Sequence, residues 1–254
     1  MINLGILGHN PYTLLISEAI AKQPDFNVVG AYSHEPTPFS KEISRRLNIF
    51  CSESGLPLFK ERGIRVAGLL DDFIDRSDVF LEYEANTLAM KISFGSAGFS
   101  VTPKDAMRER LSQELPLKKV HLREVSEVIA CCPQFKLFRM ELTLSRSLGK
   151  EEIVDSLLST PRMGALYGGN VSLTDLCLFL STSVKPSLFS CIVLLDSIEI
   201  KEGSKTYIDF LSLVGKLLVL PEAIDTIRES NKIYREISKG ITDKSLNIRS
   251  GLVT

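Results

Sequence analysis

Short apolar runs alternate with stretches of helical periodicity over the first 83 residues. Residues 2–8 form an apolar run of strand length that ends on glycine, and apolar residues then recur at helical spacing from Leu14 onward. The same criteria predict strands at 26–32, 48–51 (an edge strand), 64–68 and 78–83, and helices at 40–46, 56–63 and 70–77. This alternation predicts a Rossmann-like α/β domain with a parallel, helix-covered sheet.

The pattern changes after residue 95. Residues 93–100 are rich in small side chains and predict a hinge or loop, and a charged helix is predicted at 105–114. Longer apolar runs predict strands at 125–132, 135–144, 190–200 and 210–220, with helices at 150–158 and 172–180. Together they predict a smaller α+β domain with a mixed or antiparallel sheet.

Pro221 opens a final helix that is predicted to continue to Lys239 and to stop at Gly240. We therefore expect a Rossmann-like domain at 1–95, completed by the C-terminal segment 221–254. The α+β domain is expected at 96–220.

Composition narrows the function classes. The 254 residues carry a net charge of −1, so nucleic acid is not indicated as a partner. No apolar run approaches the ~20 residues that span a bilayer, and the chain begins directly with a strand, so we expect no membrane segment and no signal peptide. Five cysteines without C-x-x-C spacing are typical of reduced thiols in a cytoplasmic protein, and three dispersed histidines predict no metal site.

The turn after the first strand resembles a dinucleotide-binding turn that has lost most of its glycines. Such a turn has the pattern G-x-G-x-x-G, in which glycines let backbone amides approach a pyrophosphate. Here the pattern is Gly8-His9-Asn10-Pro11-Tyr12-Thr13. Asn10 tolerates the turn conformation, but Pro11 removes an amide and Tyr12 adds bulk. The candidate cofactor contacts, as vestiges, are Gly5, Gly8, Asn10 and Thr13, and no bound cofactor is expected.

An acidic residue near the end of the second strand would hold the ribose of NAD. Glu35 is the candidate, but it lies beyond the expected strand end and directly before Pro36. We therefore expect it to belong to a solvated loop.

Several segments resemble the archaeal-type glyceraldehyde-3-phosphate dehydrogenase family, in the family's order. They are residues 5–8, 26–30 and 61–68 in the first half, and 151–162 (ending in T-P-R), 196–198 (D-S-I), 220–228 (L-P-E-A-I-D-T-I-R) and 242–248 (T-D-K-S-L-N-I) in the second. The resemblance covers roughly residues 1–90 and 125–254. It implies a nucleotide-binding domain joined to a catalytic domain.

The chain departs from that family at the positions of the catalytic residues. The family's nucleophile lies in S-C-N-T-T, a string that this sequence lacks, and the missing length falls around residues 95–125. Cys132, after Cys131 and before Pro133, lies in a predicted apolar strand, where burial would raise the thiol pKa. His121, beside Lys118 and Lys119, is the one remaining candidate for the family's substrate-phosphate histidines, and we expect it at the surface.

Two hypotheses follow. The first is a shortened, divergent paralogue that is non-catalytic and acts as a binding or assembly module for a macromolecular partner, a protein rather than nucleic acid or membrane, with self-association as a further option. The second is an NAD(P)-dependent oxidoreductase with a rewired site. That enzyme would bind NAD or NADP and would draw its acid, base or nucleophile from His9, His34, His121 or Cys132.

Overall fold

The structure, a computed structural model, describes residues 1–84, 89–94, 97–101, 120–128, 135–144, 147–167, 189, 191–201, 206–248 and 251–252. The chain divides into two units. Unit 1 comprises Met1–Thr102 and Val219–Leu246, and unit 2 comprises Pro103–Leu218 and Asn247–Thr254. Residues 247–254 therefore belong to unit 2, whereas the predicted division placed all of 221–254 with the first domain. The physical reason is that strand β14 (Gly251–Leu252) pairs with β10 (Met163–Leu166) of unit 2.

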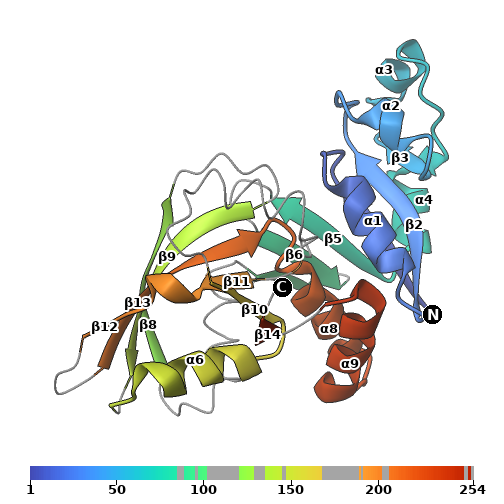
Figure 1. Ribbon diagram of the computed structural model, residues 1–254. Coiled ribbons are helices and arrows are strands. Elements are labelled where there is room, and N and C mark those ends of the chain that lie inside the picture. Colours follow the sequence, from blue (N-terminus) through green and yellow to red (C-terminus); the bar gives the residue numbers. More distant parts are fainter. Residues whose placement is uncertain are drawn as a thin grey trace. The chain divides into compact units, whose positions relative to one another are not determined.

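Unit 1 contains a seven-stranded sheet in the order β4-β3-β2-β1-β5-β6-β7. Its parallel strands are β1 (Ile2–Leu7), β2 (Phe26–Ser33), β3 (Ile49–Cys51), β4 (Gly68–Leu69) and β5 (Val79–Glu84). Helices α1 (Thr13–Ala21), α2 (Ser40–Ile43), α3 (Leu56–Glu61) and α4 (Leu70–Arg76) connect them, as Figure 1 shows. This arrangement confirms the predicted Rossmann-like α/β fold. Strand β3 is not an edge strand, because β4 pairs along its outer side.

The stretch predicted as a hinge or loop at 93–100 is mostly strand. Strands β6 (Ala89–Phe94) and β7 (Ala97–Val101) form an antiparallel hairpin, and β6 pairs antiparallel with β5. The prediction was wrong because small residues suggested a turn over the whole segment. Met90 and Ile92, which directly precede the segment, are buried at the two-residue spacing of a strand that continues into it.

Unit 2 contains a mixed sheet in the order β14-β10-β11-β13-β9-β8, with β12 pairing on β13. The remaining strands are β8 (Val120–Val128), β9 (Phe135–Leu144), β11 (Cys191–Leu194), β12 (Glu199–Lys201) and β13 (Thr206–Gly215). Helix α6 (Lys150–Ser159) is labelled in Figure 1. Its Ile153 and Leu157 form a core with buried side chains of β9 and β13. The mixed sheet with a helix on it agrees with the predicted α+β architecture.

The strand predicted at 190–200 is interrupted. A short 3-10 turn, Leu195–Ser197, separates β11 from β12, and both strands pair with β13. Between them the amide of Leu211 donates to the hydroxyl of Ser197 at 2.8 Å. A side chain therefore replaces a backbone acceptor where the strand is broken.

The predicted C-terminal helix is two helices, α8 (Leu220–Ser230) and α9 (Arg235–Leu246). The chain turns between them at Lys232, whose φ is +66°. Gly240 lies inside α9 and does not end it. Ser238, Thr242 and Leu246 are buried at four-residue spacing, which shows that α9 continues to pack beyond Gly240.

The helices predicted at 105–114 and 172–180 lie outside the described residues. In the part of the chain that is described, no helix combines the length and the apolar character needed to cross a membrane.

Candidate functional site

The turn between β1 and α1 contains three of the four predicted contacts. Gly8 has φ of +88°, a conformation that favours glycine, and its amide donates to the carbonyl of Tyr32 at 2.7 Å. Gly5 lies three residues earlier, inside β1. A Cβ at Gly5 would lie 2.4 Å from Cζ of Phe73, so this glycine allows α4 to pack closely on the sheet.

The turn satisfies its own amides. The amide of Asn10 donates to Oγ1 of Thr13 at 3.0 Å, and that hydroxyl donates to the carbonyl of Gly8 at 3.0 Å. The amide of Tyr12 donates to Oδ1 of Asn10 at 2.8 Å. The amide of Thr13 donates to the carbonyl of Asn10 at 3.2 Å, and Pro11 has no amide proton to offer. Oxygens of the turn therefore accept from the amides of Asn10, Tyr12 and Thr13, donors that a phosphate-binding turn would direct at its ligand.

Two tyrosine rings are in contact at the same turn. The rings of Tyr12 and Tyr83 meet edge to face, with centroids 5.1 Å apart, and Nδ2 of Asn10 donates to the carbonyl of Tyr83 at 3.4 Å. Burial, with a smaller contribution from Tyr12, raises the pKa of Tyr83 above that of an ordinary phenol. Tyr83 therefore stays protonated at neutral pH and is not poised to act as a base.

The loop after β2 meets this turn. Ser33 ends the strand and its hydroxyl donates to the carbonyl of Glu35 at 2.7 Å. Glu35 is exposed beyond the strand end, and His34 is also exposed. The hydroxyl of Thr37 donates to the carbonyl of His9 at 2.7 Å, which joins the loop to the β1–α1 turn.

The side chain of His9 makes the second link between the two loops. It is 3 % exposed, with Nδ1 lying 2.8 Å from Oγ of Ser40 and Nε2 lying 3.3 Å from the carbonyl oxygen of Ala31. The ring also meets Phe59 of α3 edge to face. Sequence reasoning missed Thr37 and Ser40, because two hydroxyl residues in a proline-rich loop carry no signal of what they contact.

Two other candidate catalytic residues, Cys132 and His121, have no described side chain. Cys131 and Cys132 lie outside the described residues, and only the backbone of His121, in β8, is described. Among the described cysteines, Cys51 and Cys191 are buried and form no disulfide, and burial raises the pKa of the Cys51 thiol. The described part of the chain also holds no group of three histidine, cysteine or acidic side chains arranged for a metal.

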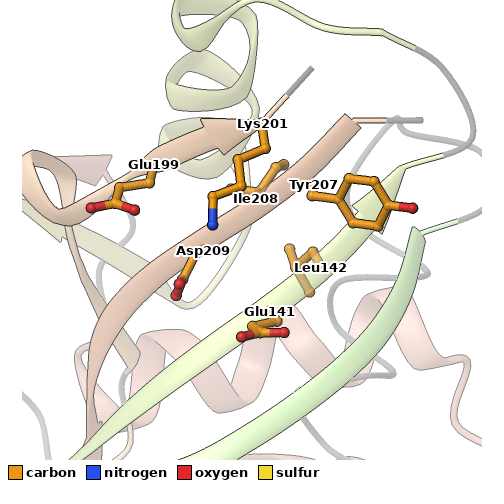
Figure 2. A pocket seen from close by; sticks show the side chains of 7 residues that line it. All are labelled: Glu141, Leu142, Glu199, Lys201, Tyr207, Ile208 and Asp209. Carbon is orange, nitrogen blue, oxygen red and sulfur yellow. The ribbon is translucent and has the colours of Figure 1, made fainter. Parts of the chain in front are cut away.

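Unit 2 carries a separate, charged groove of about 200 Å³, which sequence reasoning did not foresee. Figure 2 shows its lining from β9, β12 and β13: Glu141, Leu142, Glu199, Lys201, Tyr207, Ile208 and Asp209. Strand register places three of the acids in one row, because Glu199 pairs with Asp209 and Asp209 pairs with Glu141. Charged residues at two-residue spacing, such as Arg139 with Glu141, were the available signal, but the row depends on register between distant strands.

The groove is partly neutralised by an adjacent arginine. Nε of Arg139 donates to both carboxylate oxygens of Asp209, at 3.0 and 2.9 Å, and Nη2 adds a further bond. The hydrogen bond and charge of Arg139 hold the pKa of Asp209 below its ordinary value, against the opposing effect of burial. Asp209 therefore stays ionised at neutral pH and is not available as a general acid.

Comparison with known proteins gives partial matches. No protein-family model matches the chain. It is 32 % identical to the glyceraldehyde-3-phosphate dehydrogenase of Thermoplasma volcanium over 83 residues, 32 % of this chain and 25 % of the relative. It is 32 % identical to that of Saccharolobus solfataricus over 87 residues, and 29 % identical to that of Metallosphaera sedula over 87 residues, each match covering 34 % of this chain and 26 % of the relative. The match thus spans about a quarter of the relatives' length. About a third of this chain is related to the archaeal glyceraldehyde-3-phosphate dehydrogenases.

Proposed function

We propose that this chain is a divergent paralogue of those dehydrogenases that no longer holds a dinucleotide and has no catalytic role. It acts in the cytoplasm as a binding or assembly module for a protein partner. The observation that carries the proposal is the β1–α1 turn, where Asn10 and Thr13 supply oxygens to the amides that would otherwise meet a pyrophosphate.

Binding a dinucleotide at this turn would require several changes at once. The side chains of Asn10 and Thr13 would have to release two backbone amides, each bond contributing about 0.5–1.5 kcal/mol. The ring of Tyr12 would have to leave Tyr83, and Pro11 would still offer no amide. A glycine-rich turn has none of these costs, because its amides are free and its backbone is open.

The sequence also lacks the motif that carries the family's nucleophile. No S-C-N-T-T string is present in the 254 residues. His9, which lies in the turn itself, is buried with both ring nitrogens within hydrogen-bonding distance of protein atoms, so it does not face a substrate. A general acid or base must lie within hydrogen-bonding reach of the reacting group.

The alternative is an NAD(P)-dependent oxidoreductase with a rewired site, and the similarity to proteins named as dehydrogenases favours it. Under this alternative the turn would open to admit NAD or NADP. The two functions differ in whether the unmodified chain binds a nicotinamide dinucleotide.

Isothermal titration of the full chain with NAD and with NADP tests the proposal. We expect no binding heat at millimolar ligand from the unmodified chain. A triple variant, Asn10→Gly with Pro11→Ala and Tyr12→Ala, removes the side chains that occupy and cover the turn, and it reports whether the lost affinity resides there. Micromolar binding by the unmodified chain, with reduction of the dinucleotide in the presence of an aldehyde phosphate, would establish the alternative.

The partner is tested separately. The tagged chain is purified at native expression level, and mass spectrometry with light scattering gives the composition and stoichiometry of what co-purifies. We expect a complex of fixed stoichiometry with a different protein. Recovery of this chain alone, as a self-oligomer that turns over a nicotinamide, would defeat the proposal.

A further inference from the structure

Two loops at the carboxyl end of the unit 1 sheet are joined through one histidine side chain. The first loop, 8–12, follows β1, and the second, 34–39, follows β2. We call the group formed by His9, Thr37 and Ser40 the His9 switch. Thr37 and Ser40 belong to the second loop and to the start of α2, so the group connects three elements.

The hydrogen bonds of this group fit a neutral histidine. The amide of Thr37 donates to Oγ of Ser40 at 2.8 Å, so the serine hydroxyl keeps its own proton for Nδ1 of His9 at 2.8 Å. Nε2 then carries the ring proton and donates to the carbonyl of Ala31 at 3.3 Å. The hydroxyl of Thr37 donates to the backbone carbonyl of His9. Each polar atom of the group has a role in this one arrangement.

Protonation of His9 would redirect the hydrogen bonds of this group. Nδ1 of His9 would become a second donor to Oγ of Ser40, and the serine proton would have to turn to Oγ1 of Thr37, 3.3 Å away. Thr37 would still be using its own proton on the carbonyl of His9. The bond between Ser40 and His9 would reverse its direction, and the serine proton would be left with the longer contact to Thr37.

The described contacts of the ring provide no negative charge to stabilise a protonated His9. The ring faces Ser40, Thr37, Phe59 and the carbonyl of Ala31, none of which is charged. The charged and titratable residues of the elements packed around it are exposed: His34 and Glu35 in the second loop, Lys41 and Glu42 on α2, Lys60 and Glu61 on α3, and Arg62, which donates to the carbonyl of Pro36. Burial lowers the pKa of His9, and the bond to Ala31 offsets part of that effect.

We propose that the His9 switch makes the contact between loops 8–12 and 34–39 dependent on protonation. With neutral His9 the loops are joined. When His9 takes a proton from solvent, the ring leaves its buried position, the second loop separates from the first, and the surface around the β1–α1 turn becomes accessible. This regulation does not depend on what the turn binds, so it goes beyond the proposed function.

The direction follows from linkage. Burial favours the neutral ring, so the joined state is fully stabilised above the ordinary histidine pKa of 6.5 and is weakened as the pH falls below it. One linked proton changes the opening equilibrium by about tenfold per pH unit, until His9 is protonated in the joined state as well.

Hydrogen exchange and NMR on the full chain test the proposal. Exchange protection of peptides covering 8–13 and 34–41, corrected for the intrinsic effect of pH, should fall by about tenfold per pH unit below about pH 6.5. The NMR titration of the His9 ring should share its midpoint with the loss of protection. The chain has three histidines, so the ring signals can be assigned with single substitutions.

Variants separate this switch from general acid unfolding. His9→Gln keeps a polar side chain that does not titrate, and its two loops should show no such dependence on pH. His34→Gln and His121→Gln, the matched controls, should keep the full effect. If His9→Gln fails to fold, Ser40→Ala serves instead, and the midpoint of opening should move. Titration of the His9 ring without loss of protection, or unchanged opening in His9→Gln, would overturn the proposal.

Discussion

Arg228 of α8 forms a buried ion pair with Asp25, a residue 203 positions earlier, with Nη2 2.6 Å from Oδ1. The arginine side chain has no solvent exposure. It also donates to Oε1 of Gln23 at 2.9 Å and to Oγ1 of Thr242 at 2.7 Å, and its guanidinium lies over the ring of Phe26. One side chain therefore fastens both C-terminal helices to the segment that enters β2, which explains why α8 and α9 belong to unit 1.

Removing the carboxylate should destabilise unit 1 strongly. In Asp25→Ala the buried guanidinium of Arg228 would lose its counter-charge, and breaking one side of such a pair costs about 3–5 kcal/mol. Because Asp25 keeps 28 % side-chain exposure, water can replace part of the interaction and we expect the lower end of that range. Urea unfolding followed by circular dichroism measures the change.

An exposed pair in the same unit provides the control. Arg46 lies 2.9 Å from Glu18, but the two side chains are 57 % and 54 % exposed. Glu18→Ala should cost at most about 1 kcal/mol, because solvent screens surface pairs. Equal losses in the two variants would show that burial of Arg228 has no energetic consequence.

The same ion pair should make unit 1 sensitive to acid. Burial alone would raise the pKa of Asp25, but the hydrogen bond and charge of Arg228 outweigh it and lower the pKa below its ordinary value of 3.8. The carboxylate therefore contributes stability that is present above that value and is lost as the pH falls through the lowered pKa. The free energy of unfolding, measured from about pH 6 to pH 2, should fall less steeply in Asp25→Asn than in the unmodified chain. Parallel curves for the two chains would contradict this.

Local sequence signals located most elements of unit 1, since strands and helices there follow the two periodicities closely. These signals gave the wrong element where tertiary contacts determine whether a segment is a strand or where a helix ends. The hairpin β6–β7 has glycine and serine in strand positions, where β6 pairs with β5 and β7 pairs with β6. Gly240 suggested a helix end, but the burial of Ser238 and Thr242 beside Asp225 carries α9 past it.

Only part of the candidate site can be predicted from the sequence. The loss of two pattern glycines, where Asn10 and Thr13 now stand, is visible in the sequence, and so is the missing amide at Pro11. The bonds by which Asn10 and Thr13 take over the turn, and the meeting of His9 with Ser40 31 positions away, depend on the path of the backbone. No spacing rule specifies them in advance.

The side chain of Asn10 should stabilise the turn. Asn10→Ala removes the acceptor of the Tyr12 amide and the donor to the carbonyl of Tyr83, and one such bond contributes about 0.5–1.5 kcal/mol. We expect a loss of about 1 kcal/mol in urea unfolding and faster hydrogen exchange at the amide of Tyr12. Asn27→Ala is the control, because its exposed side-chain amide donates to the side chain of Asn3. An Asn10→Ala variant as stable as the control would mean that the side chain does not hold the turn.

Two glycines of unit 1 should respond in opposite directions to alanine. At Gly5 the new Cβ would lie 2.4 Å from Cζ of Phe73, whose fully buried ring contacts Phe50, Phe80 and Tyr32. The ring cannot move freely, so Gly5→Ala should cost about 1–3 kcal/mol through overpacking.

At Gly240, inside α9, the new Cβ would meet nothing within 4 Å. Gly240→Ala should therefore stabilise the chain by about 0.5–1 kcal/mol, the difference between the two residues in a helix interior. Thermal unfolding of both variants, each compared with the unmodified chain, tests the pair. A neutral Gly5→Ala would show that α4 can shift on the sheet to make room for the methyl group, and would contradict the overpacking argument.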